Sequence, residues 1–280
     1  MQELHEIQLD PIVTNALKED WGYGDWTTDI CIDADVMSKA QIICKEDCVV
    51  AGLEVVRYVF KKVDPELNIV QHVKNGDFVK DRSVLLEISG KARSILKAER
   101  VALNFMGRLC GIASKTAKFV QAVEGTGSQI LDTRKTTPGL RILEKQATVI
   151  GGARNHRFGL CDGVMVKENH IRAAGGIKKA LSKLQESLPT TLKIEVETTN
   201  LDEVKEAVDA NADIIMLDNM SPADMKEAVK FIDGRAFTEA SGNVKLDTVR
   251  QVAECGVNFI STSSFIQSAQ VSDLSLLFEV

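Results

Sequence analysis

The chain has 280 residues, of which 44% are hydrophobic and 26% charged, and these values exclude a disordered or collagen-like protein. Its net charge of −6 disfavours a nucleic-acid partner, because generic nucleic-acid binders are basic. The polar, acidic N-terminus does not resemble a signal peptide, and the uncharged stretch 255–272 is too rich in Ser, Thr, Asn and Gln to span a membrane. Six scattered cysteines without a C-x-x-C pair favour free thiols in a reducing compartment. We therefore expect a cytoplasmic protein with no membrane partner.

The first third of the chain is predicted to be an α+β region. A short amphipathic helix is expected over 10–20 and a second helix over Leu53–Val63. Short runs rich in Val, Ile and Leu, separated by turn signals, predict strands at Lys39–Lys45, Leu67–Val73 and Val84–Ser89. From Arg93 to Val123 the pattern is helical, and Gly107 and Gly111 leave open whether this is one long helix or a broken pair.

After Gly125 short apolar runs alternate with helical ones. Strands are predicted at Gln129–Leu131, Gly163–Val166, Leu192–Val196, Asp213–Leu217, Ala236–Thr238 and Asn258–Ile260. Helices are predicted to begin near Gly139, Ile171, Leu201, Pro222 and Lys245, with Ser221 as the N-cap that precedes Pro222. This alternation implies parallel βαβ units, in either a barrel or a doubly wound sheet.

Polar and charged side chains follow every one of these strands. The strand ends read LDTRK, VKENH, EVE, LDN, EASGN and ISTSS in chain order. In a parallel barrel such ends converge on one face, which is where active sites lie. Six polar strand ends in succession therefore predict a single site on that face.

The charges around this predicted site are uneven. Residues 131–170 contain seven Lys or Arg and four Asp or Glu, a local net charge of +3 in an acidic chain. Clustered cations of this kind favour a small polyanionic ligand. Glu195 and Glu197 share a strand face, and Glu197, nearer the strand end, is the better candidate to hold a sugar hydroxyl or Mg²⁺ together with Asp218. The small and hydroxyl residues of the last two loops favour phosphate binding.

Longer segments of the chain resemble quinolinate phosphoribosyltransferase. In chain order they are EDWGYGDWTTD, ERVALNFMGRLCGIASKT, LDTRKTTPGLRILEKQA, GGARNHRFGL, VMVKENHI, IEVET, IIMLDNM and EASGN. These motifs are long, and the resemblance covers nearly the whole chain.

The resemblance implies a pentosyltransferase of de novo NAD biosynthesis. With Mg²⁺, the family joins quinolinate to phosphoribosyl pyrophosphate and yields nicotinate mononucleotide, pyrophosphate and CO₂. The implied fold is α/β, with an open α/β sandwich over 1–110, an incomplete (β/α) barrel over 111–270, and a tail, 271–280, that packs on the N-terminal domain. A homodimer or higher oligomer is implied, with each site shared between subunits.

The same resemblance implies roles for individual residues. The quinolinate pocket would be formed by Thr133, Arg134, Lys135, His156, Arg157 and Lys167, with Arg100 reaching in from the neighbouring subunit. Glu197 and Asp218 would hold the ribose and the metal, and with Lys135 they are the predicted catalytic residues. Ribose and phosphate would also be held by Ser241, Gly242, Asn243, Ser261, Thr262 and Ser263. Without the resemblance, Arg100 would be interpreted as a surface residue that pairs with Glu99 or Glu54.

The chain departs from the family's usual pattern at Ser263 and Ser264, where Gly and Ala are usual. A Gly permits close backbone approach to an anion, so this departure leaves open a paralogue with another substrate. Two other functions stay open at this point. One is a Schiff-base aldolase that uses Lys135 or Lys167, and the other is an anion-binding or regulatory barrel without chemistry.

Overall fold

The computed structural model describes residues 4–279, which form two compact units. The first unit contains residues 4–117, 137–152 and 268–279, and the second contains 118–136 and 153–267. Our predicted boundaries, 1–110, 111–270 and 271–280, stay a prediction. All six cysteines are free thiols. None of the helices in residues 4–279 combines the length and the apolar character that crossing a membrane requires.

The first unit contains a four-stranded antiparallel sheet in the order β12-β1-β5-β3. Its strands are β1 (Met37–Cys44), β3 (Asn68–Gln71), β5 (Val84–Lys91) and β12 (Leu274–Phe278). Alternate residues of β1 are buried, as expected for a sheet with one covered face. The C-terminal strand β12 pairs with β1, from Ala40 opposite Phe278 to Cys44 opposite Leu274. A separate two-stranded pair, β2 (Cys48–Val49) and β4 (Phe78–Val79), was not predicted, because runs of two residues carry no periodicity.

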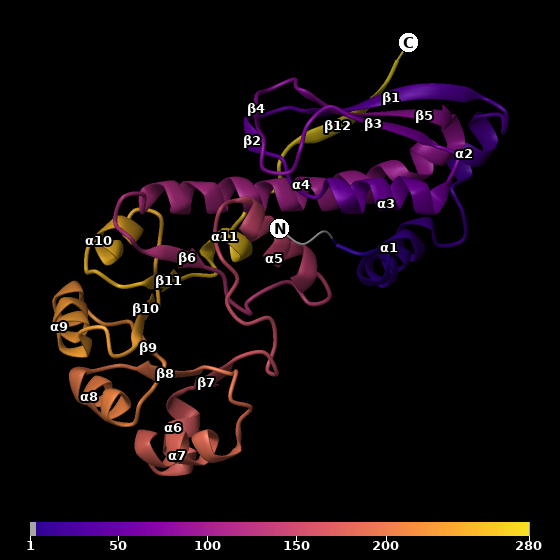
Figure 1. The fold of residues 1–280 in the computed structure, drawn as a ribbon. Helices are drawn as coiled ribbons and strands as arrows, with labels where there is room; N and C mark the ends of the chain where they lie inside the picture. Colours follow the sequence, from indigo (N-terminus) through magenta and orange to yellow (C-terminus); the bar gives the residue numbers. More distant parts are fainter. Residues whose placement is uncertain (1–3, 280) are drawn as a thin grey trace. The chain divides into compact units, whose positions relative to one another are not determined.

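Five helices belong wholly or partly to this unit. They are α1 (Glu6–Trp21), α2 (Trp26–Cys31), α3 (Leu53–Val63), α4 (Ala92–Ala122) and α5 (Arg141–Ile150). Helix α3 has the predicted bounds, and Figure 1 shows α3 and α4 lying along the sheet. Helix α4 continues unbroken through Gly107 and Gly111. A Cβ at Gly107 would lie 2.8 Å from the carbonyl oxygen of Ser272, so this glycine permits a close chain crossing rather than a break.

The second unit contains a six-stranded parallel sheet in the order β6-β11-β10-β9-β8-β7. Its strands are β6 (Gln129–Leu131), β7 (Val164–Val166), β8 (Ile194–Thr198), β9 (Ile214–Asp218), β10 (Phe237–Ser241) and β11 (Phe259–Ser261). Figure 1 shows these strands following an arc. Arg154, which belongs to no strand, forms one isolated parallel bridge with Leu131 at the end of β6. Within residues 4–279 no pairing joins β6 to β7. The barrel is therefore incomplete.

Helices connect these strands and cover the outer side of the arc (Figure 1). They are α6 (Glu168–Ala174), α7 (Ile177–Ser187), α8 (Leu201–Asp209), α9 (Pro222–Ile232), α10 (Val249–Ala253) and α11 (Ser264–Gln267). As predicted, Ser221 caps α9, and its hydroxyl accepts from the backbone N–H of Asp224. The single helix predicted near Ile171 is wrong: Gly175 and Gly176, with φ of +83° and +123°, separate α6 from α7.

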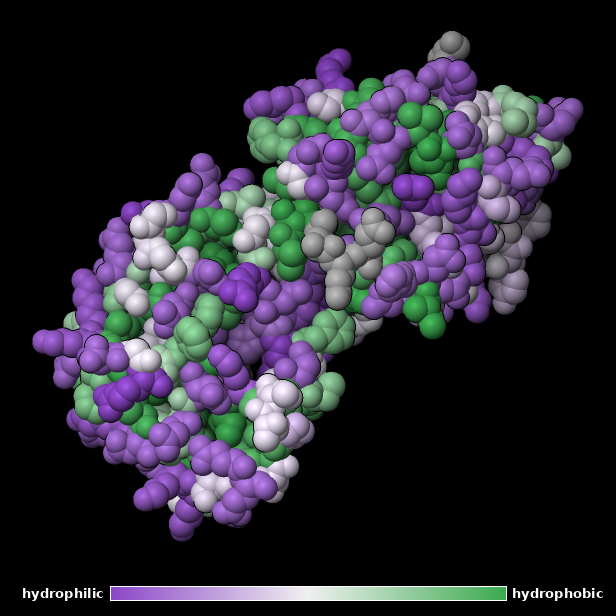
Figure 2. All heavy atoms as spheres, in the orientation of Figure 1, coloured by the Kyte–Doolittle hydropathy of each residue, from purple (hydrophilic) through white to green (hydrophobic). Residues whose placement is uncertain are grey.

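The predicted fold class is confirmed. An antiparallel sheet with helices precedes a parallel sheet with connecting helices, and the parallel sheet closes only part of a barrel. On the face shown in Figure 2 the helices around the parallel sheet present mainly hydrophilic residues, with apolar residues in small patches.

Candidate active site

A cavity of about 560 Å³ lies at the carboxyl ends of the parallel strands. Twelve of our fifteen predicted site residues line it: Thr133, Arg134, Lys135, His156, Arg157, Lys167, Glu197, Asp218, Ser241, Gly242, Asn243 and Ser261. The remaining lining residues are Met165, Met216, Asn219 and Glu239. The convergence expected from the sequence therefore occurs within the second unit alone.

The period of the strands explains why these side chains share one cavity. Side chains two residues apart on a strand point to the same face. Glu195 and Glu197 on β8 are therefore neighbours on the inner face, as are Glu239 and Ser241 on β10. The register places Ser241 opposite Asp218. Through Met216 the register places Glu197 level with Glu239, so Glu195 lies deepest, Glu197 and Glu239 lie above it, and Asp218 and Ser241 lie nearest the mouth.

One wall of the cavity is cationic. Arg134, Lys135, Arg157 and Lys167 all line it. Burial and the charge of Arg134 both lower the pKa of Arg157. The Arg157 guanidinium also donates from Nη1 to the carbonyl oxygen of Gly163 at 3.0 Å. Two guanidinium groups close enough to repel each other form a site in which a bound anion is favourable.

Two acids, Glu197 and Asp218, form an acidic wall next to these cations. Lys167 Nζ lies 2.5 Å from Glu197 Oε2. Burial raises the pKa of Asp218, and the charge of Glu197 raises it further, while the hydrogen bond from Asn219 acts in the opposite direction. The cavity thus places cations and carboxylates side by side, as a substrate with both an anionic part and a developing cation would require.

A tight loop follows β10 beside this acidic wall. Gly242 has φ of +93°, and a Cβ there would lie 2.6 Å from Nδ2 of Asn219. Asn243 and Asn219 both adopt left-handed backbone conformations, and Asn243 Nδ2 donates to Asn219 Oδ1 at 2.9 Å. Only glycine fits at position 242 without displacing Asn219.

Three predicted residues do not line the cavity. Thr262 is buried, and its hydroxyl donates to the carbonyl oxygen of Val244 at 3.1 Å. The Ser263 hydroxyl is 2.6 Å from Oε1 of Gln267, beside α11. Arg100 lies on α4 in the first unit, is exposed, and makes no ion pair or hydrogen bond within residues 4–279. The surface pair with Glu54 is not formed, and Glu54 instead accepts from Asn75 at 2.7 Å.

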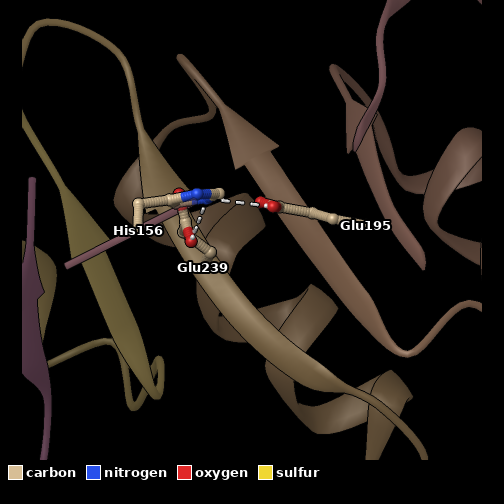
Figure 3. Close-up of side chains that lie close together, drawn as sticks. All are labelled: His156, Glu195 and Glu239. Carbon is tan, nitrogen blue, oxygen red and sulfur yellow. Dashed lines mark ion pairs between the residues drawn. The ribbon is translucent and has the colours of Figure 1, made fainter. Parts of the chain in front are cut away.

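A cluster of His156 with two buried glutamates escaped the sequence analysis. His156 Nε2 lies 3.0 Å from Glu195 Oε2 and 3.5 Å from Glu239 Oε2, as Figure 3 shows. The sequence analysis weighed Glu195 only as a weaker candidate than Glu197 for the sugar or metal, and it gave Glu239 no role. A spacing of two residues does indicate that Glu195 shares a strand face with Glu197, and Glu239 with Ser241. It does not indicate that a histidine from a separate loop lies between the two glutamates.

Burial alone would lower the pKa of His156, but the two carboxylates outweigh it and raise that pKa to about 10. Burial and the charge of Glu239 raise the pKa of Glu195. Because the backbone N–H of Arg157 donates to His156 Nδ1 at 2.7 Å, the proton of the ring is on Nε2, where it faces the two carboxylates.

Two family models match most of the chain. Residues 25–110 match the family model of the quinolinate phosphoribosyl transferase N-terminal domain, and residues 112–277 match that of the C-terminal domain. A curated relative from Synechocystis, named probable nicotinate-nucleotide pyrophosphorylase [carboxylating], is 45% identical over 96% of this chain and 92% of its own length. A relative from Nicotiana tabacum, named quinolinate phosphoribosyltransferase [decarboxylating] 2b, mitochondrial, is 42% identical over 96% of this chain and 81% of its own.

Solved structures show the same likeness. The crystal structure of NadC from Streptococcus pyogenes superposes with a TM-score of 0.96 at 38% sequence identity, covering 100% of both chains. Both sequence and fold are therefore similar to this group over essentially the entire chain.

Proposed function

This chain belongs to the quinolinate phosphoribosyltransferase family, and on that premise we propose that it joins quinolinate to phosphoribosyl pyrophosphate in de novo NAD biosynthesis. The products are nicotinate mononucleotide, pyrophosphate and CO₂. The observation that carries this proposal is the single cavity that is lined both by a cationic wall and by Glu197 and Asp218.

The cationic wall suits the two adjacent carboxylates of quinolinate. Each charge-assisted hydrogen bond contributes about 1.5–3 kcal/mol net, so several are needed to bind a dianion out of water. In this proposal Arg134, Lys135, Arg157 and Lys167 provide these donors. Thr133, whose hydroxyl accepts from the backbone N–H of Lys135 at 3.0 Å, flanks them. His156 completes the wall of the cavity.

The acidic wall suits the sugar. Departure of pyrophosphate leaves positive charge on the ribose ring, as in glycoside chemistry. Glu197 and Asp218 would orient the ribose and stabilise this charge. The loop residues Ser241, Gly242 and Asn243, with Ser261, would hold phosphate. Thr262 and Ser263 would contribute through the backbone, because their hydroxyls are engaged elsewhere.

The same two acids fit Mg²⁺. This ion prefers one or two carboxylates together with substrate phosphate oxygens. The charge of Glu197 raises the pKa of Asp218, and a divalent cation would relieve that repulsion. When bound, the ion supplies charge neutralisation at the leaving pyrophosphate.

The reaction requires no protein nucleophile. The pyridine nitrogen attacks the ribose carbon as pyrophosphate leaves. The resulting cationic nitrogen stabilises the electron pair that stays on the neighbouring ring carbon when CO₂ departs, and a proton from water then binds to that carbon. Positioning and electrostatics are then the contribution of the protein. The Schiff-base alternative is disfavoured for Lys167, because its ion pair with Glu197 stabilises the charged ammonium that cannot attack a carbonyl.

The proposal extends to assembly and compartment. An exposed Arg100 with no partner in residues 4–279 is suited to reach the site of a neighbouring subunit, so we infer a homodimer or higher homo-oligomer with shared sites. The free cysteines agree with a reducing, cytoplasmic location.

The test is an assay with quinolinate, phosphoribosyl pyrophosphate and Mg²⁺ that measures pyrophosphate and nicotinate mononucleotide. Nicotinate should be used at least about 100-fold less efficiently, because it lacks one carboxylate and would leave part of the cationic wall without an anionic partner. Equal efficiency with the two substrates would contradict the dicarboxylate pocket. No turnover of quinolinate at any Mg²⁺ concentration would contradict the function itself.

A further inference from the structure

Both ring nitrogens of His156 are engaged by the protein itself. Nδ1 accepts from the backbone N–H of Arg157 at 2.7 Å, and Nε2 faces Glu195 and Glu239 at 3.0 and 3.5 Å. Figure 3 shows the ring held between the two carboxylates. A histidine in this arrangement has no ring nitrogen aimed at a substrate, although it lines the cavity.

The two glutamates are placed at considerable energetic cost. Glu195 is 3% exposed and Glu239 is 1% exposed, and one oxygen of each, Oε1, has no hydrogen-bond partner within residues 4–279. Two buried carboxylates at one site repel each other unless a positive or proton-bearing group lies between them. The imidazole of His156 is that group.

The cluster is connected to the cationic wall through the backbone. The N–H of His156 donates to Oδ1 of Asp132, which is fully buried at the end of β6, at 2.8 Å. The next N–H, that of Arg157, donates to the imidazole. The guanidinium of Arg157 then donates to Gly163 at 3.0 Å. The position of Arg157 thus depends on the orientation of the ring, and the ring depends on the glutamates.

We propose that Glu195 and Glu239 are positioning residues that act through His156 to hold Arg157 in the geometry that recognises a substrate carboxylate. Glu239 has the more direct part, because it lines the cavity together with His156 and Arg157, whereas Glu195 lies one layer deeper. The proposal rests on the proposed function and assigns a role to two residues that the motif comparison left without one.

A metal ion is the competing occupant of this cluster, since the His156, Glu195 and Glu239 ligand atoms lie within 4.8 Å of one another. The surroundings oppose it. The guanidinium groups of Arg134 and Arg157 repel each other beside the cluster, and a divalent cation there would add to that repulsion. The N–H of Arg157 also directs the imidazole so that its proton-bearing nitrogen faces the acids.

The test compares Glu239→Gln, His156→Asn and the double variant. Asn keeps an oxygen that can accept from Arg157 N–H but cannot reach the glutamates. Each single variant should raise KM for quinolinate by at least about tenfold, with a smaller change in kcat and little change in KM for phosphoribosyl pyrophosphate. Since both act through the same ring, the double variant should be no worse than His156→Asn alone. Additive effects, or an equal rise in both KM values, would overturn the proposal.

A matched control is available in the first unit. His72 Nε2 pairs with Glu87 Oε1 at 3.3 Å, and both side chains are about 40% exposed. Glu87→Gln makes the same chemical change in a His–Glu pair, and KM for quinolinate should stay at the wild-type value. A rise there equal to that of Glu239→Gln would show that the effect is not specific to the cluster.

A measurement on the wild-type protein covers the case in which Glu239→Gln does not fold. Nitrogen-15 NMR of labelled histidine should show a hydrogen-bonded, slowly exchanging Nε2 proton that disappears in His156→Asn. A rapidly exchanging Nε2 proton, or one equivalent of Zn²⁺ bound by the wild type and lost in His156→Asn, would overturn the proposal. Because this readout needs no turnover, it tests the cluster separately, and failure of the wild type to use quinolinate counts only against the proposed function.

Discussion

Lys167 and Glu197, 30 residues apart in the chain, meet with 2.5 Å between Nζ and Oε2. They lie at the carboxyl ends of the adjacent strands β7 and β8, so one residue of the proposed quinolinate wall neutralises one residue of the proposed ribose wall. An ion pair of this kind keeps both charges in place at the site before substrates arrive. When an anion binds beside Lys167 and a sugar beside Glu197, the ion pair would be replaced by a contact of Lys167 with the anion and a contact of Glu197 with the sugar.

Asp218→Asn is expected to reduce kcat by about 100-fold, because it removes charge that stabilises the ribose cation mainly in the transition state. Quinolinate affinity should survive, since the cationic wall is intact. Steady-state kinetics with a separate quinolinate binding assay would measure both. The control is Asp202→Asn, an exposed acid whose pair with Lys205 lies on α8. An unchanged kcat in Asp218→Asn would show that the ribose role is misassigned.

The pH dependence should report Asp218. Its pKa is raised above the ordinary 3.8, mainly by burial, so the functional carboxylate is lost at a higher pH than for an exposed aspartate. The efficiency for phosphoribosyl pyrophosphate should therefore fall as pH decreases through this raised pKa. The charge of Lys167 lowers the pKa of Asp218, so in Lys167→Gln the loss of efficiency on the acidic side of the pH profile should occur at higher pH. A limb that persists unchanged in Asp218→Asn belongs to another group.

Mixed oligomers should test whether Arg100 serves a neighbouring subunit. Arg100→Ala subunits and Lys135→Ala subunits should each be nearly inactive alone. A mixed dimer should contain one pocket with both groups and one with neither, so a substantial fraction of activity should return. Mass spectrometry of the mixture would confirm that mixed dimers form. If they form and activity does not return, Arg100 acts in its own subunit's site or in none.

Gly242→Ala should raise KM for phosphoribosyl pyrophosphate and destabilise the fold by about 1–3 kcal/mol. The added Cβ would meet the side chain of Asn219, which lies against Asp218. Gly234→Ala separates backbone strain from the clash with Asn219. Gly234 also has a positive φ, +73°, but there is open space around its Cβ position. Gly234→Ala should lower the melting temperature alone. Equal KM values for the two variants would exclude a local effect at the site.

The sequence by itself determined the order of elements and the strand ends that carry chemistry. Helix α3 and strand β6 have the predicted bounds, because apolar periodicity and turn residues are local properties. The motif TRK and the residues Lys167, Glu197 and Asp218 were assigned to one site because parallel strands place their carboxyl ends together, and the cavity contains all of them.

Tertiary structure decided what depends on contacts between distant segments. The two glycines inside α4 allow residues 270–272, which lie far along the chain, to cross the helix closely, so they do not break it. The strands β2 and β4 are too short for any pattern, and they exist through their pairing. The clearest case is His156: its neighbours in sequence indicate only a cation-rich loop, whereas its ring is held by Glu195 and Glu239 from two different strands. The burial of these acids and the repulsion between their charges arise only when the two strands and the loop come together in the fold. The spacing of residues along the chain therefore does not indicate them.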